Sequence, residues 1–555
     1  MLEKKWWHSS VVYQIYPRSF CDSNNDGIGD LKGIISKLDY LKELGIDVIW
    51  LSPVYKSPND DNGYDISDYR DIMDEFGTMD DFDELLKQVH NRGMKLIIDL
   101  VINHTSDEHP WFIESRSSKD NAKRDWYIWR DGKENDEPNN WESIFGGSAW
   151  EKDEKTDQYY LHLFSRRQPD LNWENEDMKL AIYDMMNWWL DKGIDGFRVD
   201  AISHINKEKG LKDMPNPDNL KYVSSFDKHM NVDGIHKYLK EIKDNTYGKY
   251  DVMTVGEANG VTPDDAHLWV SEEDGKFNMV FQFEHLDLWN NTDTNKKFDL
   301  VEFKDVLSKW QYNLHNVGWN ALFIENHDIP RIVSMIGNDK KYWYESATCL
   351  GLMYFMQEGT PFIYQGQEIG MTNVEFDSIE DYNDVKTKNN YYIGLEEGYS
   401  HEELIKNAWR LSRDNARTPM QWNGSIYGGF SEHKPWINSN PNYKTINVES
   451  QLNDKNSILN FYKNMIKIRK ANEALVYGEY KLILENDKNI YAYERILENE
   501  KFIIITNMSN NNATYSYDKA SLNYNNLIIS NIQVNTHEST SEIELKPWEC
   551  RMYKI

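Results

Sequence analysis

The hydrophobic positions of this chain follow a repeating pattern. Apolar residues at helical spacing in 31–44 are followed by Gly45 and then by a short apolar run, 46–51. The same unit recurs in 82–103 and in 181–200. Weaker copies precede three more apolar runs, which begin at Val252, Leu322 and Pro361. Strands that are apolar throughout and alternate with helices are typical of a parallel sheet buried on both faces.

The number of these runs indicates the architecture. With residues 11–16 as the first strand the chain has at least seven, which predicts an α/β fold with an eight-stranded (β/α)8 TIM barrel. A doubly wound open sheet is the alternative. No G-x-G-x-x-G or Walker-type phosphate loop follows any of the strands, and this counts against the alternative.

Two interruptions of the pattern predict further domains. Residues 105–174, after the third strand, are polar and rich in Trp, Asp and Asn, and an insertion of this size usually forms a wall of the active site. In residues 475–555, short alternating runs separated by Asn-rich turns predict a C-terminal antiparallel β domain. The barrel is then expected in two parts, 1–104 and 175–474.

Three carboxylates close separate apolar runs. They are Asp200, Glu257 and Asp328. Parallel strands of one barrel end on the same face, where such barrels keep their chemistry. Two or three acids in one cleft are what glycoside hydrolysis requires, and a structural ion-pair network is the alternative.

Composition narrows the classes of partner. A formal net charge of -30 over 555 residues argues against nucleic acid or an anionic membrane as a partner. Three cysteines form no disulfide framework and indicate a reducing compartment. The N-terminus lacks the apolar region of a signal peptide, and no run of about 18 apolar residues occurs. We therefore expect a cytoplasmic monomer.

Six longer motifs surround the three acids. In chain order they are 99–106, 168–173, 196–200, 255–258, 325–328 and 359–366. Together they resemble the α-amylase family of glycoside hydrolases over essentially the whole chain. Gln168, just before Pro169, is similar to the form typical of the oligo-1,6-glucosidase and α-glucosidase branch.

The resemblance implies an exo-acting, retaining α-glucosidase that acts on a small oligosaccharide. Such an enzyme hydrolyses non-reducing terminal α-1,6 and α-1,4 bonds and releases α-glucose. The resemblance makes Asp200 the nucleophile, Glu257 the acid/base and Asp328 the transition-state stabiliser. Arg198, two residues before Asp200 on a strand, points to the same face and can hold that carboxylate ionised.

The resemblance also implies the residues of the sugar pocket. His104 and His327 would donate hydrogen bonds to sugar hydroxyls. Asp61, Tyr64 and Arg417 would close the pocket behind the terminal glucose, because an Arg–carboxylate pair can bracket a sugar hydroxyl. The candidate stacking platforms for the sugar ring are Tyr64 and Phe164.

Residues 22–30 copy the order of an EF-hand loop. Its ligand positions 1, 3, 5, 7 and 9 correspond to Asp22, Asn24, Asp26, Ile28 and Asp30. Gly27 stands at position 6, but Gly33 replaces the bidentate Glu of position 12. The order predicts a structural Ca²⁺ or Mg²⁺ away from the catalytic acids, with a solvated turn rich in Asn and Asp as the alternative.

Two departures from the family bear on specificity. Ala201 follows the nucleophile where isomaltose-cleaving relatives tend to carry Val, and Ile329 follows Asp328 where Gln is usual. Activity on both α-1,6 and α-1,4 linkages is therefore expected. Trehalose-6-phosphate hydrolase and a sucrose-converting relative are alternatives that no basic cluster or arginine-rich loop supports. A non-enzymatic homologue is disfavoured because all three acids are present.

Overall fold

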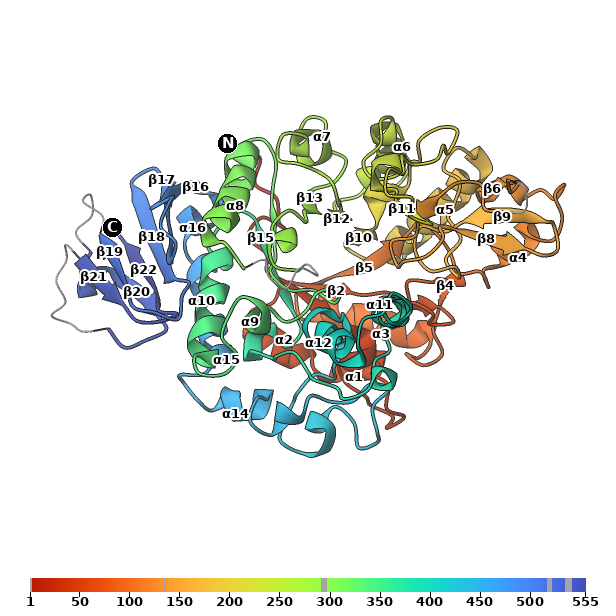
Figure 1. The fold of residues 1–555 in the computed structure, drawn as a ribbon. Coiled ribbons are helices and arrows are strands. Elements are labelled where there is room, and N and C mark those ends of the chain that lie inside the picture. Colours follow the sequence, from red (N-terminus) through yellow and green to blue (C-terminus); the bar gives the residue numbers. More distant parts are fainter. Residues whose placement is uncertain (1, 134–135, 291–296, 517–521, 535–541) are drawn as a thin grey trace.

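An eight-stranded sheet forms the centre of the molecule in the computed structural model, which describes residues 2–133, 136–290, 297–516, 522–534 and 542–555 (Figure 1). In chain order its strands are β1 (Val12–Ile15), β2 (Val48–Leu51), β5 (Lys95–Val101), β10 (Gly196–Asp200), β12 (Met253–Glu257), β13 (Met279–Phe281), β14 (Ala321–Leu322) and β15 (Thr360–Tyr364). Hydrogen-bonded neighbours follow the order β13–β12–β10–β5–β2–β1–β15–β14, and these pairs are parallel. Because β13 and β14 are also in contact, the sheet closes, and the predicted barrel is confirmed.

Two strands differ from the sequence prediction. Strand β13 was not predicted, since its three residues are too few to show a periodic pattern. The apolar run 322–328 was expected to be a strand, but β14 ends at Leu322, the first residue of that run. The prediction that Asp328 closes a strand is therefore wrong, and this residue lies in the loop after β14.

Helices complete the repeating units and begin and end where the sequence indicates. The helices that follow or precede the barrel strands include α1 (Leu31–Ser36), α2 (Leu38–Leu44), α3 (Met79–Asn91), α5 (Glu176–Lys192), α6 (Ile235–Asn245), α8 (Leu300–Leu314) and α10 (Trp343–Phe355). Gly45 and Gly193 end α2 and α5 in left-handed conformations, with φ of 104° and 103°. Thr78 begins α3 with a capping box to Asp81. No described helix is long and apolar enough to cross a membrane.

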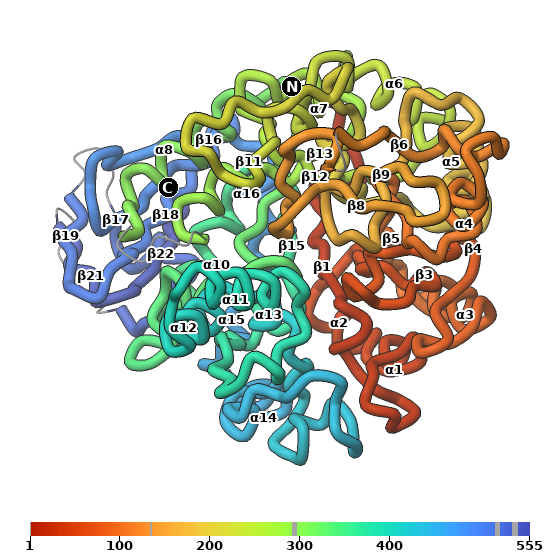
Figure 2. The backbone as a smooth tube through the Cα atoms, turned by 45° about the vertical axis from the view of Figure 1, so that its right-hand side comes forward, coloured from red at the N-terminus to blue at the C-terminus, as the bar shows by residue number. Residues whose placement is uncertain are grey.

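The 105–174 segment contains its own small sheet and core. The sheet consists of β6 (Trp129–Arg130), β9 (Gln158–Leu161) and β8 (Trp150–Asp153), and its apolar cluster includes Trp141 and Leu161. A second loop braces it, because β7 (Trp141–Glu142) pairs with β11 (Val223–Ser224) from the connection after β10. Figure 2 shows this segment, in orange, beside the strands of the barrel.

The chain closes with an antiparallel sheet on the side opposite the insertion (Figure 1). Its order is β16 (Glu479–Ile483), β17 (Ile490–Leu497), β18 (Glu500–Asn507), β22 (Cys550–Lys554) and β20 (Leu527–Ser530). The predicted antiparallel C-terminal sheet is confirmed. It is tied to the barrel by Lys304 of α8, whose buried ammonium group donates to the carbonyls of Leu484, Asp487 and Ile490.

A helical excursion after β15 carries side chains into the site. It contains α11 (Val385–Glu396), α12 (His401–Leu411) and α13 (Asp414–Arg417). A separate apolar cluster that includes Phe376, Tyr382 and Ile405 holds it together. Arg413, between α12 and α13, lies over the Phe145 ring of the insertion at 4.9 Å, so the excursion and the insertion meet above the barrel.

Candidate active site

Two carboxylates stand at the carboxyl ends of neighbouring barrel strands. Asp200 is the last residue of β10 and Glu257 is the last residue of β12, and these strands pair in parallel. Their side chains are about one-tenth exposed, at 10% and 13%, so both are largely withdrawn from water. Parallel pairing of adjacent strands therefore brings together two of the predicted acids.

Arg198 connects these two acids. Its Nη1 lies 2.7 Å from Oδ1 of Asp200, and its Nη2 lies 2.9 Å from Oε2 of Glu257. The same Nη1 lies 2.8 Å from Oδ1 of Asp99, a fully buried residue of β5. One guanidinium group thus faces three carboxylates, as the two-residue spacing on β10 predicted for Asp200.

The contacts leave one oxygen of each acid available. Oε2 of Glu257 also accepts the backbone N–H of Ala201 at 2.7 Å, so a proton on this carboxyl belongs on Oε1. Oδ1 of Asp200 accepts from Arg198, which leaves Oδ2 to face a ligand. Burial and the nearby Glu257 carboxylate raise the pKa of Asp200 well above its usual range, against the opposing effect of Arg198.

Asp328 has a different environment. Its Oδ1 accepts from Nη2 of Arg417 at 2.9 Å and from Nη1 of Arg413 at 3.3 Å, and its Oδ2 lies 3.0 Å from Nε2 of His327. Burial opposes ionisation, but His327 and the two guanidinium groups hold the pKa of Asp328 well below its usual range. This acid is therefore a permanent negative charge near neutral pH.

The structure corrects the arginine assigned to Asp61. Nη2 of Arg413 lies 2.9 Å from Oδ1 of Asp61, and the same guanidinium group binds Asp384. Arg417 is fully buried and donates to Asp328 and to the carbonyl oxygen of His327. The predicted Asp61–Arg417 pair is wrong, because the residue that reaches Asp61 is Arg413, one helical turn earlier.

The predicted ring side chains line the same region. Tyr64 stacks on His327 with ring centroids 5.2 Å apart, and its hydroxyl lies 2.5 Å from Nε2 of that histidine. Burial lowers the pKa of His104 to about 4, so its neutral ring donates from Nε2 to the carbonyl oxygen of Tyr64. Phe164 is partly buried, with its ring 5.1 Å from that of His104.

Several residues of the site were not singled out as site residues from sequence. They are Asp99, Gln168, Asp384 and Arg413. Asp99 and Gln168 lie inside the motifs 99–106 and 168–173, and Gln168 donates to Oδ2 of Asp61 at 3.2 Å. Asp384 and Arg413 belong to the helical excursion, where no motif marked them. Only their contacts reveal them.

The 22–30 loop does not present a formed cation site. Asp22 accepts three backbone N–H groups of the loop, Asp26 accepts that of Ile28, and Asp30 caps α1 through the N–H of Gly33. Among the described residues, no three acidic, histidine or cysteine side chains are placed to hold one metal ion. Asn24 and the carbonyl oxygen of Ile28, two of the predicted ligands, are not among these residue types, so the predicted ion stays a proposal, and no step of the chemistry is routed through it.

Comparisons with known proteins agree with this geometry. The family model for the catalytic domain of alpha amylase matches residues 14–478. The chain is 58% identical to a probable oligo-1,6-glucosidase 3 of Bacillus subtilis and 55% identical to an oligo-1,6-glucosidase of Parageobacillus thermoglucosidasius, with 100% of each chain covered. A solved structure of trehalose-6-phosphate hydrolase from Bacillus licheniformis superposes with a TM-score of 0.93 at 45% identity, covering 99% of this chain and 100% of that one.

Proposed function

This chain belongs to the α-amylase family, and we propose that it is an exo-acting, retaining glucosidase of short α-glucosides. The observation that carries the proposal is the ion-pair cluster of Arg413 with Asp61, Asp328 and Asp384. We infer that this cluster ends the site on one side, since its Asp328 is close enough to act on the pKa of Asp200. The names of the two relatives above support oligo-1,6-glucosidase activity as the form of this function.

The proposed first step divides the work between two carboxyl groups. Oε1 of Glu257 gives its proton to the glycosidic oxygen while Oδ2 of Asp200 attacks the anomeric carbon. The bond to the leaving sugar breaks as the bond to Asp200 forms, which leaves a covalent glucosyl-enzyme. In the second step Glu257 takes a proton from water, and water displaces Asp200 with overall retention.

Charges around these acids act on the assigned roles in opposite directions. Arg198 stabilises the carboxylate of Asp200 before attack, although burial and Glu257 raise the pKa of Asp200. Arg198 also contacts Glu257, so one guanidinium group holds both acids in position. Asp328 stays negative and is proposed to stabilise the positive charge that develops on the sugar ring.

The exo-action rests on the closed end of the pocket. Arg413 spans Asp61 and Asp384, so planar donors and carboxylate oxygens face the side where a further sugar would extend. A terminal hydroxyl can hydrogen-bond to such a pair, whereas a glycosidic oxygen carries a substituent that the pair would exclude. Which linkage is cleaved depends instead on the side of the leaving sugar. There the small Ala201 methyl group is expected to allow both α-1,6 and α-1,4 bonds.

Product analysis tests the proposal. We expect isomaltose, maltose and maltotriose to release glucose as the α-anomer, with starch a poor substrate. NMR of the nascent products reports the anomer, and chromatography reports the size of the products. Internal cleavage of starch with little glucose would contradict the closed pocket, and β-glucose as the first product would contradict retention.

One alternative has a specific observation behind it. The structural likeness to a trehalose-6-phosphate hydrolase makes that substrate worth a direct comparison. The assay measures kcat/KM for trehalose 6-phosphate and for isomaltose under the same conditions. A higher value for the phosphorylated sugar would replace the proposed substrate while leaving the roles of the three acids unchanged.

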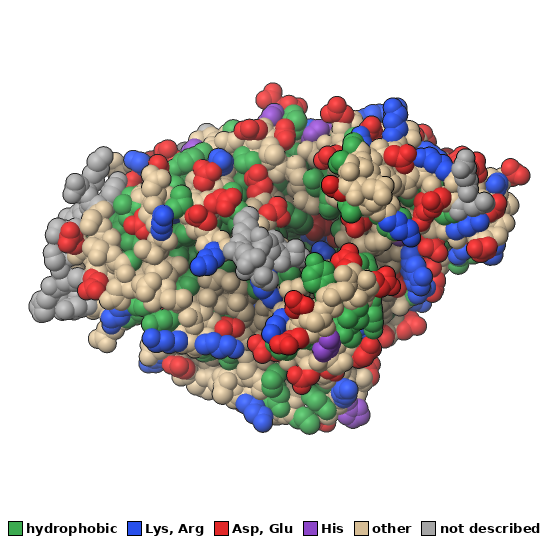
Figure 3. Space-filling model, in the orientation of Figure 1, with side chains coloured by type: hydrophobic (Ala, Val, Ile, Leu, Met, Phe, Trp, Pro, Cys, Tyr) green, Lys and Arg blue, Asp and Glu red, His purple; other side chains and the backbone are tan. Residues whose placement is uncertain are grey.

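Three further properties remain proposals. A cytoplasmic location is supported by the three cysteines, which form no disulfide. A structural Ca²⁺ in the 22–30 loop is supported by the order of its oxygen-bearing residues alone. A monomer without nucleic-acid or membrane partners is supported by the net charge of -30, and Figure 3 shows acidic side chains spread over the visible face.

A further inference from the structure

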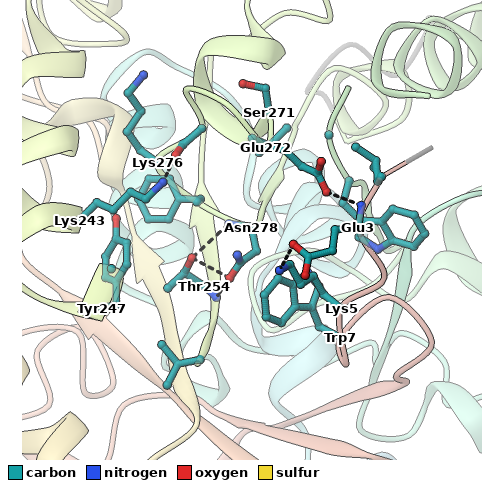
Figure 4. Close-up of a pocket in the computed structure, with 18 of the residues that line it drawn as sticks. Glu3, Lys5, Trp7, Lys243, Tyr247, Thr254, Ser271, Glu272, Lys276 and Asn278 are labelled. Atoms are coloured by element: carbon teal, nitrogen blue, oxygen red, sulfur yellow. Dashed lines mark hydrogen bonds and ion pairs between the residues drawn. The ribbon is translucent and has the colours of Figure 1, made fainter. Parts of the chain in front are cut away.

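A second cavity lies at the opposite end of the barrel from the acids, and we call it the amino-end cavity (Figure 4). Its volume is about 420 Å³. Val252, Asn278 and Trp319, which line it, immediately precede or lie close before strands β12, β13 and β14. Asp200 and Glu257 stand at the other ends of their strands, so this cavity is separate from the proposed active site.

One wall of the amino-end cavity carries two ammonium groups. Lys243, from α6, donates to the carbonyl oxygen of Gly275 at 2.6 Å, and Lys276 donates to that of Leu268 at 2.9 Å. An ammonium group has three donors, and the contacts within the described structure use one from each lysine. Burial and the nearby ammonium group of Lys243 lower the pKa of Lys276, against the opposing effect of Asp274. Positive charge is therefore concentrated at this wall.

Two neutral polar groups of the lining are also donors. Oδ1 of Asn278 accepts both the backbone N–H and the hydroxyl of Thr254, so the Asn278 NH₂ group is what remains to meet a ligand. The hydroxyl of Tyr247 is buried and has no hydrogen-bond partner among the described residues. Figure 4 shows Tyr247 beside Lys243 on this wall. A buried hydroxyl without a partner is costly, which points to a missing acceptor.

The acids of the cavity are engaged on the facing wall. Oε1 of Glu272 accepts the backbone N–H of Glu3 at 2.7 Å, and Oε2 of Glu3 accepts from Lys5 at 2.6 Å. Figure 4 shows these residues across the cavity from Lys243 and Lys276. These two acids thus contact the N-terminal segment, and the acid that acts on Lys276 is Asp274, which does not line the cavity.

We propose that the amino-end cavity binds a compact oxyanion, either free phosphate or the phosphate group of a small monoester. Lys243 and Lys276 supply the charge, and Asn278 and Tyr247 supply neutral donors. A phosphate oxygen accepts several hydrogen bonds at once, which matches a cavity whose lining offers donors from four side chains. The rings of Trp7 and Phe277, which also line the cavity, can pack against the organic part of a monoester.

Titration calorimetry with inorganic phosphate tests the site. Ionic strength is held constant with sodium chloride, because unspecific screening would otherwise mimic binding. We expect saturable binding to the wild-type protein and at least tenfold weaker binding to Lys243→Gln and to Lys276→Gln. The matched control is Lys237→Gln, on the same helix, whose lysine pairs with Glu241 and does not line the cavity. Its affinity for phosphate should equal that of the wild type.

A fourth variant separates binding from a structural role. Tyr247→Phe removes the hydroxyl that lacks a partner, so it should weaken phosphate binding without lowering the melting temperature. All four variants should hydrolyse an aryl α-glucoside at the wild-type rate, since they lie at the far end of the barrel. No saturable binding to the wild type, or equal affinity in wild type, Lys276→Gln and Tyr247→Phe, would overturn the proposal.

The source of the oxyanion is resolved by one more titration. Glucose 6-phosphate is titrated in saturating glucose, which occupies the active site. Tighter binding than that of inorganic phosphate assigns the cavity to a sugar phosphate, because the ring then contributes contacts of its own. Equal or weaker binding assigns it to free phosphate.

Discussion

The proposed active site joins two regions that are built differently. Asp200 and Glu257 end adjacent strands of the barrel, and Arg198 on one of these strands contacts both. Asp61 and Arg413, by contrast, come from loops far apart in the chain and are held by ion pairs between side chains. The strand-borne region therefore fixes the reacting groups, and the loop-borne region fixes which end of a sugar can enter.

The largest effect is expected from the strand-borne region. Asp200→Asn replaces the proposed nucleophile by an amide that cannot form the glucosyl ester, and turnover should fall on the order of 10⁴-fold. The rate of glucose release from maltose and isomaltose measures it. Because Arg198 keeps its ion pairs with Asp99 and Glu257 in this variant, the melting temperature should not fall by more than about 3 °C. Unchanged turnover would instead favour a chain whose acids have no catalytic role.

The same division explains what the sequence could predict. Residues two apart on a strand point to the same face, so the sequence alone could place Arg198 and Asp200 together. Parallel strands end at one face, and this placed Glu257 near them. Asp328 was expected to end a strand as well, but that strand ends at Leu322, so only the motif 325–328 marks this residue.

The contacts of the loop-borne region could not be predicted from the sequence in the same way. The segment that closes the pocket contains both Arg413 and Arg417, and nothing in their spacing says which one reaches Asp61. That choice depends on the junction between α12 and α13, which turns Arg413 toward the pocket and buries Arg417 behind Asp328. Loops have no periodicity that could reveal such a choice, because it is decided by contacts between segments far apart in the chain.

The second prediction breaks the loop-borne region at its centre. Arg413→Lys keeps the charge but loses the planar fork that spans Asp61 and Asp384, so kcat/KM for isomaltose should fall about 100-fold, mainly through a higher KM. Steady-state kinetics on isomaltose and maltose give both parameters.

Arg417→Lys is the matched comparison for this prediction. Arg417 makes the shorter of the two arginine contacts to Asp328, at 2.9 Å against 3.3 Å from Arg413, and Asp328 is proposed to act in the transition state, so the main effect of this variant should be on kcat. A rise in KM as large as that of Arg413→Lys, with kcat unchanged, would return the pocket-closing role to Arg417.

A smaller effect, on the preference between linkages, is expected from a change at Ala201, which is proposed to face the leaving sugar. Ala201 has a left-handed backbone with φ of 44°, and its N–H holds Oε2 of Glu257. Ala201→Val adds two methyl groups there, and a contact of that size discriminates by about 1–3 kcal/mol. We expect the ratio of kcat/KM for isomaltose over maltose to rise about tenfold. An unchanged ratio would show that this position does not select the linkage.

The smallest effect is expected from removal of any cation, because the 22–30 loop already satisfies its own carboxylates. Asp22 accepts three loop N–H groups and Asp30 caps α1, so the loop can keep its shape without an ion. An ion that binds the folded loop would still stabilise it by mass action. We therefore expect excess chelator to lower the melting temperature by at most about 3 °C and to leave kcat unchanged, since the loop contributes no reacting group. Differential scanning calorimetry with chelator, and again after Ca²⁺ is restored, measures the shift.

Asp26→Asn, which removes one carboxylate, should abolish the recovery. A fall of ten degrees or more would mean that the loop depends on its ion, and that its carboxylates converge on a metal rather than on their own backbone.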